Sequence, residues 1–442
     1  MRAAYDTIQR LYAGRRAMEF EYAFEMSASS IRFGPGVTRE VGMDLADLKV
    51  RRAMVVTDPY LAKLPPVATV LESLGREKVQ FELFDRVKIE PTDVSLQEAI
   101  TFAREGGFDA YVAVGGGSAM DTAKAANLYA TYPADFLDYV NAPIGKGKPV
   151  PGPAKPLFAI PTTAGTGSET TGVVIFDLIA MHAKTGIAHR YLKPTLGLID
   201  PENTRTMPPM VATATGFDVL VHALESFTNL PYNRRERPTR PALRPAYQGR
   251  NRISDLWASE AIRLATRYLP RAVENPDDDE ARASMILAAC YAGIGFGNAG
   301  LHLPHGMSYP VSSMIRNFRM PGYPGNQPIV PHGISVVLNA PAAFRFTAAV
   351  CPERYLEAAR FMGADVSHAK TIDAGSILAD QLIRLMKRLN VPNGLSAIGY
   401  TREDIPALVK GTLPQHRVIK LSPRPAGREE FAQLFEDSMV LW

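Results

Sequence analysis

The sequence predicts an α/β domain with a mostly parallel, Rossmann-like sheet, followed by an all-α domain. Apolar runs alternate with helical patterns up to about residue 200, and strand signals nearly vanish beyond that point. The 442 residues, of which 46% are hydrophobic and 21% charged, are enough for two well-buried cores. We therefore expect domains at residues 1–205 and 206–442.

The first domain is expected to contain buried strands joined by helices. A helix is predicted over residues 95–105, where Leu96, Ile100 and Phe102 recur at helical spacing. Because strands and helices alternate, the sheet should be mostly parallel. Apolar runs mark the clearest strands at 52–58, 110–117, 157–163 and 195–200.

The second domain is expected to be built from long helices and two irregular loops. Proline-rich stretches at 229–252 and 319–331 predict the loops, and long loops of this kind are often functional. The uncharged segment 285–304 contains repeated glycines and lacks flanking anchors, so we interpret it as a buried helix rather than a membrane span. Helical patterns cover 210–228, 254–274, 279–295, 376–389 and 428–439.

Charge and cysteine usage restrict the class of protein. A net charge of +4 without a dense basic block argues against a nucleic-acid partner but is compatible with small anionic ligands. Cys290 and Cys351 are too few for a disulfide framework, so we expect two buried thiols in an intracellular protein. We expect no signal peptide and no membrane partner. A cytoplasmic location is predicted, with the mitochondrial matrix as the alternative if a presequence was removed.

A glycine turn follows the strand at 110–117 and opens a helix. Backbone N–H groups and the positive end of a helix dipole would there face a phosphate. The extended pattern GGGSxxDxxK places Asp121 and Lys124 on the same helix face, which favours a nucleotide site over a simple tight turn. It is not the G-x-G-x-x-G fingerprint of a standard Rossmann site.

A second loop, PTTAGTGSETT from Pro161, also follows an apolar strand. Its hydroxyl groups are candidate cofactor donors, since ligands bind at the carboxyl ends of parallel strands. Asp58 ends another strand, where its carboxylate could accept both ribose hydroxyls of NAD and repel the extra phosphate of NADP. The alternative is that Asp58 only caps the following turn. The hydroxyl candidates are Thr162, Thr163, Thr166 and Ser168.

Four residues suggest a divalent metal site. Asp218 and His222 are four residues apart on one helix face, and His305 and His332 each precede a glycine. One carboxylate with three imidazoles suits a first-row dication such as Fe2+, and Zn2+, Mn2+, Co2+ or Ni2+ are possible on ligand type. The nearby His302 is interpreted as a core histidine or one that supports a ligand from outside the coordination sphere.

These motifs together resemble the iron-containing (group III) alcohol dehydrogenase superfamily, over nearly the whole chain. The motifs are GGGSAMDTAK, PTTAGTGSE, the Asp218/His222 pair, HGM at His305 and PHG at Pro331. The resemblance implies a dehydroquinate synthase-like architecture, with the active site between the domains and a homo-oligomeric assembly. It implies that Asp218, His222, His305 and His332 bind the metal. The residues it implies as NAD contacts are Gly116, Gly117, Ser118, Thr162, Thr163 and Lys184, and Asp121 is a further candidate for cofactor binding and catalysis.

Within the superfamily, the sequence is similar to a branch that transfers hydride between hydroxyacids and oxoacids. The resemblance implies oxidation of 4-hydroxybutyrate and reduction of 2-oxoglutarate, with NAD and the metal in one site. Tyr309 occupies the place of a second histidine found in many members, so it becomes a catalytic candidate. Substrate carboxylates need a cation, for which Arg244 is preferred over Arg240 and Arg250.

Three other classes of function are weighed against this one. The first is an ordinary NAD-dependent alcohol or 4-hydroxybutyrate dehydrogenase that releases NADH after each turnover. The second is a lyase like dehydroquinate synthase, although the substrate-binding lysine and arginine pattern of that family is not evident here. The third is a non-catalytic NAD-binding or scaffold protein, which would leave the metal ligands without a purpose.

Overall fold

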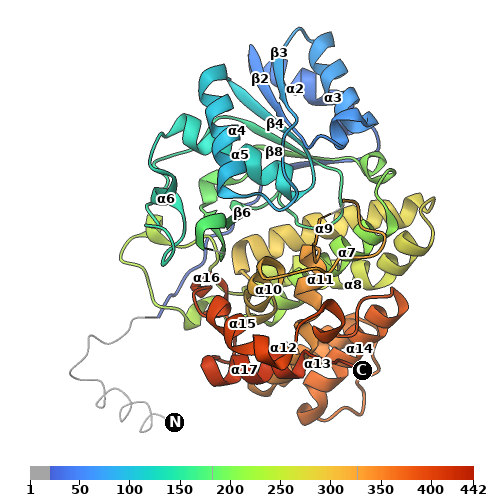
Figure 1. The fold of residues 1–442 in the computed structure, drawn as a ribbon. Helices are drawn as coiled ribbons and strands as arrows, with labels where there is room; N and C mark the ends of the chain where they lie inside the picture. Colours follow the sequence, from blue (N-terminus) through green and yellow to red (C-terminus); the bar gives the residue numbers. More distant parts are fainter. Residues whose placement is uncertain (1–19, 182, 326) are drawn as a thin grey trace.

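The computed structural model describes residues 20–181, 183–325 and 327–442; segment 1–19, on which the prediction of no signal peptide was made, lies outside the described residues. A six-stranded sheet forms the upper part of the molecule in Figure 1, and helices form the lower part. Every pairing within this sheet is parallel, which confirms the predicted fold class. In spatial order the strands are β1 (Ser30–Phe33), β8 (Leu196–Ile199), β5 (Leu157–Pro161), β4 (Ala110–Gly115), β2 (Arg52–Val56) and β3 (Gln80–Phe84).

Helices cover both faces of the sheet. Alternate residues of a strand point to opposite faces, so Val55 contacts one core while Met54 and Val56 contact the other. Helices α2 (Val41–Asp47) and α3 (Pro65–Arg76) supply the first core. Helices α4 (Asp93–Gly106) and α5 (Gly117–Thr131) supply the second. Near them lie the short helix α6 (Phe136–Tyr139) and the antiparallel hairpin of β6 (Val173–Leu178) and β7 (Ala183–Ala188), which was not predicted.

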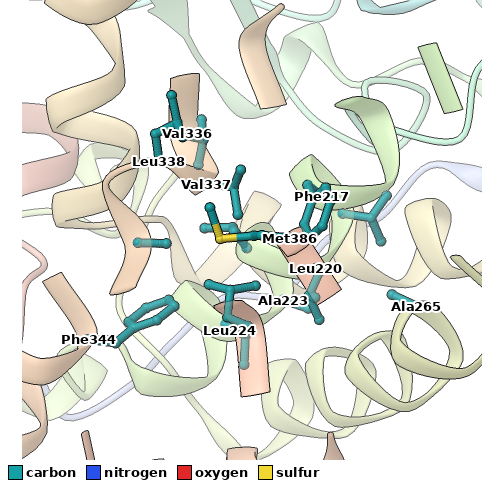
Figure 2. Packing of buried hydrophobic residues seen from close by; sticks show 14 of the residues in the cluster. Phe217, Leu220, Ala223, Leu224, Ala265, Val336, Val337, Leu338, Phe344 and Met386 are labelled. Atoms are coloured by element: carbon teal, nitrogen blue, oxygen red, sulfur yellow. The ribbon is translucent and has the colours of Figure 1, made fainter. Parts of the chain in front are cut away.

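The second half of the chain is helical and is centred on α7 (Pro209–Thr228). This helix is buried along almost its whole length and packs against α8 (Arg252–Glu274), α9 (Asp279–Ala299) and α11 (His332–Val337). Figure 2 shows Phe217, Leu220 and Leu224 of α7 in one core with Met386 from a distant helix. The other helices are α8 (Arg252–Glu274), α9 (Asp279–Ala299), α10 (Leu303–Ser313), α11 (His332–Val337), α12 (Ala340–Thr347), α13 (Pro352–Phe361), α14 (Ala374–Arg388), α15 (Ile405–Thr412), α16 (His416–Ile419) and α17 (Arg428–Asp437).

The apolar segment interpreted as a buried helix spans the end of α9 and the start of α10. The chain bends by 105° between these helices, which meet at Gly300, a residue with φ of 95°. This bent pair and the stretch His332–Val350 are apolar enough to cross a membrane by composition and length. Because 78% of the window in His332–Val350 is buried inside the protein, that stretch has the character of a core segment.

The irregular stretch after α7 is a loop, as predicted, up to Asn251, which caps α8. The Asn251 side chain accepts hydrogen bonds from the backbone N–H groups of Ile253 and Ser254, so α8 begins slightly earlier than its apolar pattern indicates. Both cysteines are free thiols. Cys290 is buried as expected, whereas Cys351 is only partly buried.

Candidate active site

A cavity of about 490 Å³ lies between the carboxyl end of the sheet and the helical half, and both halves line it. Gly115 at the end of β4 pairs in register with Pro161 at the end of β5, so the two glycine-containing loops start side by side. The sheet half contributes Gly116 and Thr162, and the helical half contributes Asp218 and His332. A cavity of this size can hold a cofactor and a small substrate.

The first loop has the geometry of a phosphate-binding turn. Helix α5 begins at Gly117, with Gly116 in extended conformation at its N-cap and no side chain capping the first turn. Gly116 and Gly117 line the cavity, so the first N–H groups of the helix are available to an anion there. A Cβ atom on Gly117 would lie 2.6 Å from the Thr166 side chain of the second loop. Glycine is therefore needed at this position for the two loops to pack together. Ser118 and Thr163 also line the cavity.

Asp121 and Ser168 line the cavity, but their polar atoms are engaged within the protein. One Asp121 carboxylate oxygen accepts a hydrogen bond from the Ser168 hydroxyl at 2.7 Å, and the other accepts one from the Ile175 N–H at 2.8 Å. Lys124, on the same helix face as predicted, donates to Ser168 and to the Val173 carbonyl. This network fixes the two loops and the hairpin. The Ser168 hydroxyl therefore donates to Asp121 within the protein, and the predicted cofactor-binding and catalytic roles of these residues stay predictions.

Asp58 and Lys184 lie on the cavity wall, where the sequence and the resemblance placed cofactor contacts. One oxygen of Asp58 accepts hydrogen bonds from the backbone N–H groups of Tyr60 and Leu61, both at 2.9 Å, so this carboxylate does cap its turn. Its ribose-binding role stays a prediction. The Lys184 ammonium forms ion pairs with Glu90 and Asp177. These two carboxylates neutralise its charge before any ligand is bound.

Three of the expected metal ligands, Asp218, His222 and His305, have ligand atoms within 4.8 Å of one another, and the fourth, His332, lies beside Asp218. The Nε2 atoms of His222, His305 and His332 lie 3.6, 3.5 and 3.7 Å from Oδ1 of Asp218. Oδ1 of Asp218 and Nε2 of His305 are buried and have no hydrogen-bond partner among the described residues. Buried polar atoms are normally paired, so these two unpaired atoms fit the role of ligands to a divalent cation held between them. We call these four residues the ligand cluster.

Helix geometry brings these ligands together. Asp218 and His222 are one turn apart on α7, and His305 lies in the first turn of α10. His332 opens α11, which crosses α7 closely. A Cβ atom on the next residue, Gly333, would lie 1.9 Å from the carbonyl oxygen of Ala214. The histidine-glycine dipeptide thus lets α11 approach near enough for His332 to face Asp218.

Glu225 supports the ligands and was missed by the sequence reasoning. Its carboxylate contacts Nδ1 of His305 and accepts hydrogen bonds from the backbone N–H groups of His302 and His305. This contact leaves Nε2 of His305 to face the other ligands. A sequence signal was available, since Glu225 follows Asp218 and His222 on the same face of α7. His302 contacts Thr228, in agreement with its expected place outside the ligand set.

Burial and neighbouring charges shift the pKa values of three ligands, and they leave His222 neutral and His305 protonated at pH 7. Burial lowers the pKa of His222 to about 3, so its ring is neutral at pH 7. Burial opposes ionisation of Asp218, but the surrounding histidines hold its pKa well below the usual range. Burial would lower the pKa of His305, yet Glu225 and Asp218 raise it to about 9. A dication would therefore displace a proton from His305.

Tyr309 lies in the cavity one turn after His305 on α10, and its hydroxyl accepts a hydrogen bond from Nη2 of Arg417 at 2.9 Å. Arg417, from α16, also lines the cavity and lies over the ring of Tyr247, 4.9 Å from its centroid. Tyr247 comes from the long loop in which Arg244 was expected to reach the substrate. No signal in the sequence singled out Arg417, because α16 is a single short turn.

Arg244 lies outside this cavity and must be corrected as a candidate. Its guanidinium forms a bidentate pair with Glu21, with distances of 3.0 and 3.1 Å. Nη1 of Arg250 lies 4.0 Å from Oδ2 of Asp255. Neither Arg250 nor Arg240 lines the cavity. The loop therefore contributes an aromatic wall through Tyr247 rather than a cation. Among the described residues, Arg417 is the arginine that lines the cavity.

A glycine turn at a helix N-terminus and a cluster of one aspartate and three histidines line the same cavity, an arrangement typical of metal-dependent, nucleotide-binding oxidoreductases. Comparison with known proteins agrees with this class. The family model for iron-containing alcohol dehydrogenase matches residues 28–201. The model for the C-terminal part of the Fe-containing alcohol dehydrogenase family matches residues 246–439. The chain belongs to the iron-containing alcohol dehydrogenase family.

Relatives and solved structures extend this result along the whole chain. The chain is 61% identical over 424 residues to "Hydroxyacid-oxoacid transhydrogenase, mitochondrial" of Xenopus tropicalis, covering 96% of this chain and 92% of the relative. It is 58% identical to the protein of the same name in Homo sapiens, covering 96% and 91%. A crystal structure of 1,3-propanediol oxidoreductase superposes with a TM-score of 0.82 at 26% identity, covering 94% of this chain and all of that one.

Proposed function

We propose that this protein is a hydroxyacid-oxoacid transhydrogenase that oxidises 4-hydroxybutyrate to succinic semialdehyde and reduces 2-oxoglutarate to D-2-hydroxyglutarate. The observation that carries the proposal is the placement of the ligand cluster opposite the two nucleotide loops in one cavity. High identity over nearly the whole length of relatives with this name supports it.

Family membership and the donor set support a divalent metal and NAD, and we propose Fe2+ as the metal. When bound, the metal supplies a Lewis acid for the substrate oxygen and NAD supplies the hydride acceptor and donor. Asp218, His222, His305 and His332 would hold the metal. The loops at Gly116 and Thr162 would hold the cofactor.

The chain's own residues position the reaction and keep water away. Glu225 orients His305, and Phe296 stacks on His222 with ring centroids 4.1 Å apart, so the ligand rings are fixed before substrate enters. The cavity wall is largely apolar near Leu301 and Phe296, which excludes water from the reacting atoms. Tyr309 carries the hydroxyl that lies one helical turn from a metal ligand, and we propose it as the group that exchanges the substrate proton.

Location and assembly are further proposals. The relatives' names include the word mitochondrial, which supports the mitochondrial alternative and gives no support to the cytoplasmic expectation. We also propose a homo-oligomer with small hydroxyacid and oxoacid substrates as its partners, and neither nucleic acid nor membrane.

A spectrophotometric assay tests the proposed function against its nearest alternative. With 4-hydroxybutyrate alone, absorbance of reduced nicotinamide should stop rising after about one equivalent per site. Adding 2-oxoglutarate should start continuous formation of succinic semialdehyde without net NADH. Continuous NADH release with 4-hydroxybutyrate alone would identify an ordinary dehydrogenase, and conversion of neither acid would reject the proposal.

A further inference from the structure

The cavity contains one cation whose charge nothing in the described chain neutralises. Of the two long basic side chains on its wall, Lys184 is paired with two carboxylates. Arg417 has no acidic partner among residues 20–181, 183–325 and 327–442. Its Nη1 atom is buried and lacks a hydrogen-bond partner among these residues. A guanidinium in this state favours an anion that presents two oxygens.

Neighbouring residues hold Arg417 in a fixed orientation. Tyr309 binds Nη2 and the Tyr247 ring supports the guanidinium plane, so two phenolic side chains frame the group without cancelling its charge. Gln415, which lies just before Arg417 in the chain, donates a hydrogen bond to the Lys184 carbonyl at 3.1 Å and so ties α16 to the hairpin strand β7. The cation is therefore placed by both halves of the protein.

The position of Arg417 relative to the metal ligands defines what it can bind. His305 and Tyr309 are separated by one turn of α10, a spacing of about 5–6 Å between Cβ atoms. A substrate oxygen at the ligand cluster and a carboxylate at Arg417 would thus be separated by a short carbon chain. In 4-hydroxybutyrate the reacting carbon is three carbon–carbon bonds from the carboxylate. In 2-oxoglutarate the reacting carbon is equally far from the distal carboxylate.

We propose that Arg417, held by Tyr309, binds the carboxylate of 4-hydroxybutyrate and the distal carboxylate of 2-oxoglutarate. One cation then determines the specificity for both the hydroxyacid and the oxoacid. This inference rests on the proposed function and names the residue that determines its specificity. The two half-reactions then place their reacting carbons at the same point. Substrates that lack the carboxylate at this spacing lose the contact.

Paired substrates and a charge-matched control test the proposal. Arg417→Met removes the cation, whereas Lys420→Gln removes an exposed cation three residues further along the chain. The diagnostic pairs are 4-hydroxybutyrate with 1,4-butanediol, and 2-oxoglutarate with 2-oxopentanoate, each pair differing in the distal carboxylate. In Arg417→Met, kcat/KM should fall about 30- to 100-fold for both acids bearing this carboxylate. In the same variant, kcat/KM should change less than about threefold for 1,4-butanediol and 2-oxopentanoate. Lys420→Gln should leave kcat/KM unchanged for all four compounds.

Binding of glutarate, measured by calorimetry, provides a readout that does not need turnover. The wild type should bind this dicarboxylate, Arg417→Met should bind it at least about 10-fold more weakly, and Arg417→Lys should lie between them. Equal losses for both members of each pair, or glutarate binding that is unchanged in Arg417→Met, would overturn the proposal. A wild type that binds glutarate through Arg417 but does not turn over 4-hydroxybutyrate would reject the proposed function and keep the carboxylate site.

Discussion

Glu225 determines which nitrogen of His305 faces the metal position. It is fully buried, and its carboxylate holds Nδ1 of His305 as well as two backbone N–H groups. A Glu225→Gln substitution keeps the shape but removes the charge that favours this orientation. We expect metal affinity to fall about 10- to 100-fold, measured by competition with a chromophoric chelator. The exposed Glu260→Gln on α8 is the control, and an unchanged affinity in Glu225→Gln would remove Glu225 from the metal centre.

Glu169 gives the protein a pH dependence that is separate from catalysis. Burial raises the pKa of this carboxyl from 4.5 to about 7, and its Oε1 atom has no partner among the described residues. Because the unfolded chain loses the proton at lower pH than the folded protein, stability from Glu169 is present below about pH 4.5. It is lost as the pH rises through about 7.

The substitution Glu169→Gln, which imitates the protonated carboxyl, should remove this dependence. Relative to the wild type, the variant should gain roughly 2 to 3 kcal/mol in free energy of unfolding between pH 5 and pH 8. Denaturant titrations at both pH values measure the difference. Parallel stability curves for the two proteins would mean that Glu169 has an ordinary pKa.

At the level of elements, the crossing of α7 and α11 assembles the metal site. A methyl group at Gly333 would meet the Ala214 carbonyl oxygen and lie 2.9 Å from Cβ of Asp218. Gly333→Ala should therefore lower the free energy of unfolding by about 1–3 kcal/mol and reduce metal occupancy. Gly75→Ala in α3, where no atom lies within 4 Å of the added methyl, should be neutral or slightly stabilising. Normal metal content in Gly333→Ala, by elemental analysis, would contradict this account of the crossing.

The elements predicted from sequence were those with a strong periodic signal. The predicted strands β2, β4, β5 and β8 are the inner strands of the sheet, and their apolar runs reflect burial on both faces. The edge strands β1 and β3 mix polar with apolar residues, so their pattern did not separate them from loops. The helices from α10 to α13 were missed because they are only 6 to 11 residues long, and Pro310 lies inside α10.

At the level of the whole molecule, the site was predictable where its chemistry was visible in local sequence. The candidate metal ligands, which the structure brings together, were selected from residue types and helical spacing. The candidate nucleotide loops, which line the cavity, were selected from glycine turns after strands. Arg417 could not be found in this way, because its place in the cavity comes from tertiary packing of a one-turn helix against α10. Arg244 was chosen incorrectly, because the distant Glu21 that neutralises it was not recognisable as its partner.

The central claim is that one cavity serves both half-reactions with the same bound cofactor. The direct measurement uses 4-hydroxybutyrate deuterated at C4, with 2-oxoglutarate and an excess of unlabelled NADH, followed by mass spectrometry of the products. The account predicts deuterium at C2 of 2-hydroxyglutarate, undiluted by the free NADH, because the cavity joins the metal ligands and the nucleotide loops in one space. Deuterium that appears in free NADH at the rate of turnover, with unlabelled 2-hydroxyglutarate, would contradict it.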